Sequence, residues 1–374
     1  MDKKLHIICL DIPLPANYGG AIDLFYKIKS LSEAGCEITL HCFQYGGRVP
    51  SAQLNLYCKK VFYYKRKTGL RGLHFALPYI ISSRNDHRLL ENLCMDNAPI
   101  LFDGLHTTYF YNHPTLEKRI KLLRAHNIEA EYYHQLAMQC QNGFRKLYYF
   151  FEATRLKRYE STLLGVNHFV SISKTEFEFF KNGYPNANHH LIHAFHANNE
   201  VLSLVGKGKY VLYHGNLSVE ENVQAVKFLI KHVFSQLNIL FIIAGKDPSQ
   251  ELMKYQTSQL TIMANPSDHE LKQLLANAHI HVLPSFQNTG LKLKLLNALY
   301  QGRFCIANST MLEGSGLESL VQLAETSQEW IQRIEHCMTN PFTIEHIEER
   351  KKGLANFDNK KNAEKLLQVV VSTH

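Results

Sequence analysis

Short apolar runs alternate with amphipathic segments along almost the whole chain, and this alternation restricts the fold more than any other feature. In the first half the apolar runs are residues 5–13, 36–43, 61–65, 99–104, 121–126 and 168–173. In the second half they are residues 210–215, 239–245, 260–264, 280–285 and 304–308. Strands that alternate with helices are typical of a parallel sheet covered on both faces. The sequence therefore predicts an α/β protein with two doubly wound, Rossmann-like parallel sheets.

The alternation is interrupted once, between residues 190 and 208, where periodicity is lost and the segment ends in glycines. A chain of 374 residues has room for two domains of ordinary size. We therefore expect a first domain over residues 1–200, a linker, and a second domain over residues 208–357. The carboxyl ends of the strands are where open α/β sheets bind ligands, so two sheets that face each other would share one central cleft.

Local signals place several helix boundaries. A long helical region over 128–164 is interrupted near Asn142-Gly143, and residues 358–371 are typical of a helix. Three Ser/Thr-x-x-Glu patterns predict capping boxes, in which the two side chains satisfy each other's backbone N–H groups. They are Ser218 with Glu221, Ser267 with Glu270, and Thr326 with Glu329.

The segment 282–308 joins two predicted strands through a loop and a helix that suit an anion. Gly290 opens the helical pattern, and Lys292 and Lys294 fall in or just before its first turn. Cations oppose the helix dipole there, and a bound anion removes that penalty because free N–H groups and the dipole both attract negative charge. No Asp or Glu occurs between residues 271 and 312 to compete for the lysines. The alternative is a buried helix whose lysines reach into water.

Charge is placed unevenly along the chain, whose net charge is +8. Residues 1–199 hold 24 Lys and Arg against 16 Asp and Glu, and the later residues hold 17 of each. The excess is concentrated at 59–72 and 145–158, where aromatic residues accompany it. Such a surface suits an anionic membrane or another polyanion, although an ordinary core helix with a basic outer side explains the second run equally well. We do not expect nucleic-acid binding, because no binding motif accompanies the charge.

The remaining composition points to a cytosolic protein. Eight cysteines occur without a C-x-x-C pair, and several lie in apolar runs, as reduced buried thiols do. No apolar run reaches the roughly 18 residues expected of a membrane span, and no secretory signal is expected. We therefore expect a cytoplasmic chain, peripheral on the inner face of the membrane if the basic surface binds lipid.

The pattern Pro284-Ser285, Gly290, Lys292-Leu-Lys294 and Asn297-Ala298 resembles the donor motif of GT-B glycosyltransferases of family 4, in the branch that reads G-T-R-L-K-x-L-E-A. The resemblance implies a GT-B fold, a nucleotide-diphosphate sugar as co-substrate, retention at the anomeric carbon, and a last helix that returns to the first domain. We expect no other cofactor, and no metal either, because the cations can stabilise the leaving diphosphate and no D-x-D element near a strand end suggests a metal site.

By the same resemblance, Lys292 and Lys294 hold the donor diphosphate and Asn297 holds the ribose in place of the usual glutamate. Gln287 or Asn288 lies near the position of the sugar-binding glutamate. Further donor contacts are assigned to Gly19 and Gly20 at the start of the first helix, to Gly215 and Asn216 after a strand, and to Lys246. The common form has Arg and Lys where this chain has Asn216 and Glu221.

Acceptor-side chemistry is assigned to His106, His126 and Glu129. Both histidines follow predicted strands, and histidine is suited to proton transfer near neutral pH. The function expected is sugar transfer to a glycan or lipid-linked acceptor. The alternatives are a GT-B-fold sugar-nucleotide epimerase, which needs cleft carboxylates, and a non-catalytic scaffold that binds nucleotide sugars.

Overall fold

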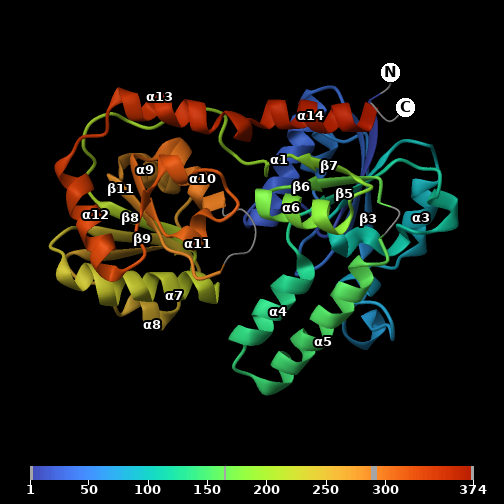
Figure 1. Ribbon diagram of the computed structural model, residues 1–374, viewed down its shortest axis with the longest axis horizontal. Helices are drawn as coiled ribbons and strands as arrows, with labels where there is room; N and C mark the ends of the chain where they lie inside the picture. Colours follow the sequence, from blue (N-terminus) through green and yellow to red (C-terminus); the bar gives the residue numbers. More distant parts are fainter. Residues whose placement is uncertain (1–2, 164–165, 288–292, 372–374) are drawn as a thin grey trace. The chain divides into compact units, whose positions relative to one another are not determined.

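The structure is a computed structural model that describes residues 3–163, 166–287 and 293–371. The chain forms two compact units (Figure 1). The first comprises Met1–Phe195 together with Asn359–His374, and the second comprises His196–Asp358. Asn288, Gly290 and Lys292, which the motif assigns to the donor site, lie outside the described residues.

The first unit is built on a seven-stranded parallel sheet with the order β3-β2-β1-β4-β5-β6-β7. Its strands are β1 Lys4–Cys9, β2 Glu37–Gln44, β3 Lys60–Lys65, β4 Ile100–Asp103, β5 Lys121–Ala125, β6 His168–Ser171 and β7 Asn188–Leu191. Its helices are α1 Gly19–Glu33, α2 Tyr79–Ser82, α3 His87–Leu93, α4 Glu129–Gln139, α5 Gly143–Glu160, α6 Lys174–Gly183 and α14 Asn359–Val371. Helices α4 and α5 pack on each other as a hairpin that extends away from the sheet (Figure 1).

The second unit has a six-stranded parallel sheet with the order β10-β9-β8-β11-β12-β13. Its strands are β8 Val211–Asn216, β9 Phe241–Lys246, β10 Leu260–Ala264, β11 Ile280–Leu283, β12 Phe304–Ala307 and β13 Gln322–Leu323. Its helices are α7 Glu220–Phe228, α8 Gln250–Met253, α9 Asp268–Asn277, α10 Leu293–Gln301, α11 Ser309–Leu312, α12 Ser327–Thr339 and α13 Ile344–Gly353.

Each sheet is covered on both faces because its strands are apolar at consecutive positions. Side chains of neighbouring strand residues point to opposite faces. Ile7 accordingly packs in the core formed with α1 and α14, whereas Ile8 packs in the core formed with α3, α5 and α6. The second sheet behaves in the same way, with Val211 and Leu212 in different cores. The prediction of two doubly wound parallel sheets is confirmed.

Some local predictions were wrong. Strand β7 was missed and overlaps the start of the predicted linker, because its sequence Asn-His-His-Leu lacks an apolar signal. Strand β13 was missed because it has two residues. The capping boxes at Ser267 and Thr326 are formed, but the one at Ser218 is not. Helix α7 begins at Glu220 without a side-chain cap, and the Ser218 hydroxyl donates to Asn216 Oδ1 instead.

Within the described ranges, every helix is too short or too polar to cross a bilayer.

Candidate active site

The loops that follow β1, β2, β3 and β4, together with residues of α2, α4 and α5, line a cavity of about 830 Å³ in the first unit. Strand order reverses between β1 and β4, so the loops after these two strands leave in opposite directions and open a crevice. The lining residues are Leu10, Asp11, Leu14, Pro15, Asn17, Tyr18, Tyr45, Gly46, Gly47, Arg48, Val49, Arg66, Tyr79, Ile80, Arg84, His106, Tyr133 and Tyr148. Of the three acceptor-side residues that the sequence predicts, His106 lines this cavity.

His106 and Glu129 lie together at this edge of the sheet, with His106 Nδ1 3.8 Å from Glu129 Oε1. Burial raises the pKa of Glu129 to about 8, against a weaker opposing hydrogen bond from Asn127. Burial, with the charge of Arg84, lowers the pKa of His106. At neutral pH the pair is therefore mainly a neutral imidazole beside a carboxylic acid, and the imidazole can accept a hydrogen bond from a ligand in the cavity.

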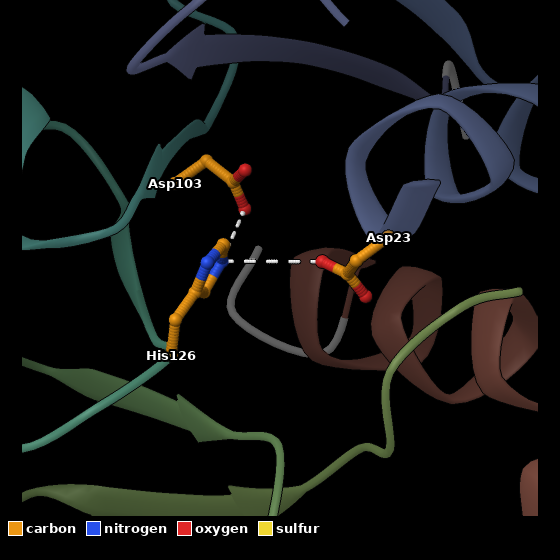
Figure 2. Close-up of side chains that lie close together, drawn as sticks. All are labelled: Asp23, Asp103 and His126. Carbon is orange, nitrogen blue, oxygen red and sulfur yellow. Dashed lines mark hydrogen bonds and ion pairs between the residues drawn. The ribbon is translucent and has the colours of Figure 1, made fainter. Parts of the chain in front are cut away.

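His126 belongs to a different cluster, which is buried beneath α1 (Figure 2). Its Nε2 lies 3.3 Å from Asp103 Oδ1 and 3.9 Å from Asp23 Oδ2. Lys27 also contacts both carboxylates, and Arg124 donates to Asp23 at 2.9 Å. The structure thus places His126 against structural ion pairs.

The geometry of this cluster would allow a metal ion, but its charge does not. Ligand atoms of Asp23, Asp103 and His126 lie within 4.8 Å of one another. Lys27 and Arg124 already neutralise the two carboxylates, so the cluster has no excess negative charge for a divalent cation. Burial opposes the ionisation of both acids, yet the charges of Arg124 and Lys27 hold the pKa of Asp23 well below its usual value. Lys27 and His126 hold that of Asp103 at about 2.

Gly19 and Gly20 open α1 beside the cavity. The N-cap residue Tyr18 provides no side-chain hydrogen bond, and the first turn contains no acid. A Cβ atom at Gly19 would meet nothing within 4 Å, and at Gly20 it would meet only the Tyr18 ring, at 3.1 Å. Packing within the unit therefore does not explain the first glycine, and the N–H groups of both residues, as the first two of the helix, have no acceptor within the helix.

In the second unit, Lys294 is held at the carboxyl end of β8. Its Nζ donates to Asn222 Oδ1 at 2.8 Å and to the Tyr213 hydroxyl at 3.4 Å. The Asn222 amide in turn donates to the carbonyl of Asn216 at 2.8 Å. Asn222 thus links Lys294 to the turn at Gly215-Asn216. The structure brings these predicted donor residues together.

A carboxylate, that of Glu221, also lies in this region. The sequence prediction rests on residues 271–312 alone, which contain no Asp or Glu. The Oε1 atom of Glu221 accepts a hydrogen bond of 2.7 Å from the Ser285 hydroxyl. Residues that are far apart in sequence can supply a carboxylate that a scan of one segment misses.

Lys246 and Asn297 occupy different surroundings. Lys246 pairs with Asn216 in the β8–β9 register, but its side chain is 53% exposed beside Asp247. The Asn297 Oδ1 atom accepts from the Asn198 amide at 2.9 Å, so this oxygen is already engaged within the unit. Neither side chain shares a hydrogen bond with Lys294 among the described residues.

Arg48, Arg66 and Arg84 are the site residues that sequence reasoning missed. The run 59–72, which contains Arg66, was interpreted only as a surface for membranes or polyanions. The sequence offers one indication that Arg84 lies near the core, because this residue directly follows the largely apolar segment Tyr-Ile-Ile-Ser-Ser. Its burial could not be read from that pattern.

Part of the second unit matches a known protein family. Residues 208–340 match the family of glycosyl transferases group 1. Over 347 residues the chain is 28% identical to an uncharacterized 44.6 kDa protein in the cps region of Klebsiella pneumoniae, covering 87% of this chain and 88% of that protein.

Solved structures with the same fold span the chain. Sucrose-phosphate synthase from Thermosynechococcus elongatus has a TM-score of 0.72 at 12% identity, and TarM has 0.70 at 10%; in each case 99% of both chains is covered. A glycosyltransferase from Rickettsia africae has a TM-score of 0.65 at 12% identity, over all of both chains. The fold is GT-B, and the family match together with these neighbours supports a GT-B glycosyltransferase.

Proposed function

We propose that this chain transfers a sugar from a nucleotide-diphosphate sugar to a glycan or lipid-linked acceptor, with retention at the anomeric carbon and without a metal ion. The observation that carries the proposal is the family match over residues 208–340, in which Lys294 is fixed beside the Gly215-Asn216 turn. The bond between the anomeric carbon and the diphosphate oxygen breaks, and the acceptor oxygen bonds to the same face. The acceptor proton passes to the leaving phosphate.

Electrostatic stabilisation of the leaving group is the part of this reaction that the chain supplies. Negative charge grows on the diphosphate as the bond breaks, and fixed cations lower the barrier most when they are already in place. Asn222 and Tyr213 hold the Lys294 ammonium group, so little reorganisation is needed. Lys292 is the second cation by resemblance to the family motif, and Gly19 and Gly20 offer backbone N–H groups.

The test measures release of nucleoside diphosphate from UDP-, GDP- and ADP-sugars by the wild-type protein and by Lys294→Gln. We expect the variant to lose at least about a hundredfold in turnover, since removing one fixed donor to a developing anion costs that much. Lys254→Gln is the matched control, because Lys254 is an exposed lysine of the same unit. Equal turnover by wild type and Lys294→Gln would contradict the proposal.

The same assay separates the two alternatives. An epimerase would invert a stereocentre of the sugar without transferring the sugar to an acceptor and without net release of nucleoside diphosphate. A scaffold would be stabilised by a nucleotide sugar without turning it over. The product analysis therefore needs the sugar stereochemistry as well as the nucleotide.

We further propose that the first unit binds the inner face of an anionic membrane. Phe75, Phe144 and Phe151 are 97%, 91% and 62% exposed, so α5 is not an ordinary core helix. Arg155, on α5, donates to the carbonyl of Phe75 at 3.1 Å, which joins the two segments. Basic side chains on α5 flank these rings, and exposed apolar groups next to cations suit a lipid surface.

Vesicle sedimentation tests this surface. Phosphatidylglycerol vesicles should pellet the protein at low salt and less at high salt, and Phe144→Ser with Phe151→Ser should reduce pelleting several-fold. Leu56→Ser removes an equally exposed apolar residue outside this surface and should change nothing. Salt-independent pelleting, or none, would overturn the membrane proposal.

A further inference from the structure

The described residues that line the cavity of the first unit include more cations than carboxylates, since Arg48, Arg66 and Arg84 face the single acid Asp11. Arg48 is paired, with its Nε 3.2 Å from Asp11 Oδ2. Among the described residues, neither Arg66 nor Arg84 lies within 4 Å of a carboxylate oxygen. The charge of Asp11 also acts on Arg84, but this one carboxylate is shared with Arg48. Glu129 is a second nearby acid, and burial raises its pKa to about 8, so it supplies little negative charge at neutral pH.

Arg66 presents most of its guanidinium group to the cavity. Its Nε donates to the Ser83 hydroxyl at 3.0 Å, and no other side-chain hydrogen bond of Arg66 is formed within the described residues. The Tyr45 and Tyr79 rings lie 4.3 Å and 5.4 Å from its central carbon. The aromatic rings and the serine thus fix the group while both terminal nitrogens keep their donors.

Arg84 is fixed even more firmly, at 2% exposure. Its Nε and Nη2 donate to the carbonyl of Leu10 at 3.1 and 3.0 Å, and its Nη1 donates to the carbonyl of Ile80. Burial, with the charge of Arg66, lowers its pKa to about 9, so it is still charged at neutral pH. A buried guanidinium bound only to neutral carbonyl oxygens is costly unless an anion joins it.

The rest of the lining suits a sugar next to that anion. Tyr18, Tyr45, Tyr79, Tyr133 and Tyr148 give the cavity flat apolar faces together with hydroxyl groups. His106 lines the same cavity as Arg66 and Arg84. A ligand that reaches the arginines can therefore contact His106 as well.

We propose that this cavity is the acceptor site and that Arg66 and Arg84 bind an oxyanion, phosphate or carboxylate, carried by the acceptor next to the sugar that is glycosylated. Planar guanidinium groups bind such anions through paired N–H donors. The inference deepens the proposed function, because it names the chemical class of the acceptor. Pyrophosphate of a lipid carrier and the carboxylate of a uronic acid share this chemistry.

The experiment is calorimetric titration of the full-length protein at constant ionic strength. The probes are pyrophosphate, inorganic phosphate, glucuronate and glucose. At least one anionic probe should bind, glucose should bind far more weakly, and Arg66→Gln should weaken the anion about tenfold or more. Arg66→Lys should recover part of the loss. Arg71→Gln, which removes an exposed arginine outside the cavity, is the matched control.

Each outcome decides the matter. Binding of the phosphates alone identifies a phosphate-bearing acceptor, and binding of glucuronate as well identifies a broader oxyanion site; both support the inference. Binding that Arg66→Gln leaves unchanged, or that only Lys294→Gln removes, overturns it. Donor turnover is measured separately with Lys294→Gln. If the anion binds through Arg66 but no turnover occurs, the proposed function fails and the anion site stands. If turnover occurs but no anion binds through Arg66, the anion site fails and the proposed function stands.

Discussion

Burial sets the protonation state of Glu129 and makes the stability of the first unit depend on pH. Its pKa rises from 4.5 to about 8 on folding. Between these values the folded protein binds more protons than the unfolded chain does, so the free energy of unfolding falls as pH increases. Each unit of pKa shift corresponds to about 1.4 kcal/mol.

Glu129→Gln should remove this dependence because the amide stays neutral. The wild-type free energy of unfolding should fall between pH 5 and pH 8, and the variant should fall less, by roughly 1 kcal/mol or more. Chemical denaturation at several pH values measures both slopes. Burial also raises the pKa of Glu160, to about 7, and leaves a residual slope in both proteins. Equal slopes for wild type and variant would show that Glu129 ionises normally.

The buried ion pairs connect elements that are distant in the chain. Asp23 of α1 accepts from Arg124 of β5 and from the backbone N–H of Phe195, at 2.9 and 2.7 Å. Lys27 bridges Asp23 to Asp103 at the end of β4. The cluster therefore fixes α1, and with it Gly19 and Gly20, against β4 and β5, the strands that precede His106 and His126.

Asp23→Asn should destabilise the first unit by about 3–5 kcal/mol, because it leaves Arg124 and Lys27 buried with too little negative charge. Glu37→Gln, which breaks the exposed pair with Lys59, is the control and should cost less than about 1 kcal/mol.

The lowered pKa values of Asp23 and Asp103 have a second consequence. Their stabilisation is present above the unfolded pKa of 3.8 and is lost as pH falls through the folded values, so the variant should also be less sensitive to acid.

Elements with a strong apolar period were predictable from sequence, and contacts between them were not. The strands from β1 to β6 and from β8 to β12 follow buried runs, but β7 is polar because it lies at the edge of its sheet. The role of Asn222 depends on Lys294, 72 positions away, and the contact of Glu221 with Ser285 spans 64. Local patterns contain no information about such pairs. Arg84 was missed for the same reason, since its partners are backbone carbonyls.

The whole molecule consists of two units with separate cores, and this predicts where each ligand acts. Apolar side chains of β1 to β6 pack with α1, α3, α5, α6 and α14, whereas those of β8 to β12 pack with helices of the second unit. A ligand stabilises the unit that it binds, by about 2.7 kcal/mol at a hundredfold excess over its dissociation constant. Local opening of the other unit need not change.

Hydrogen exchange of the full chain tests whether the nucleotide sugar binds the second unit and the anion binds the first. A nucleotide sugar that the protein turns over should slow amide exchange at 211–222 and 293–301, around Lys294, and Lys294→Gln should abolish that protection. Pyrophosphate, when it binds through Arg66, should slow exchange at 44–48 and 79–85 instead, and Arg66→Gln should abolish that. Because the two variants lie in different units, each serves as the control for the other. If the nucleotide sugar slowed exchange only in the first unit, the donor would bind there. That result would contradict the donor site around Lys294 and the acceptor site in the first-unit cavity.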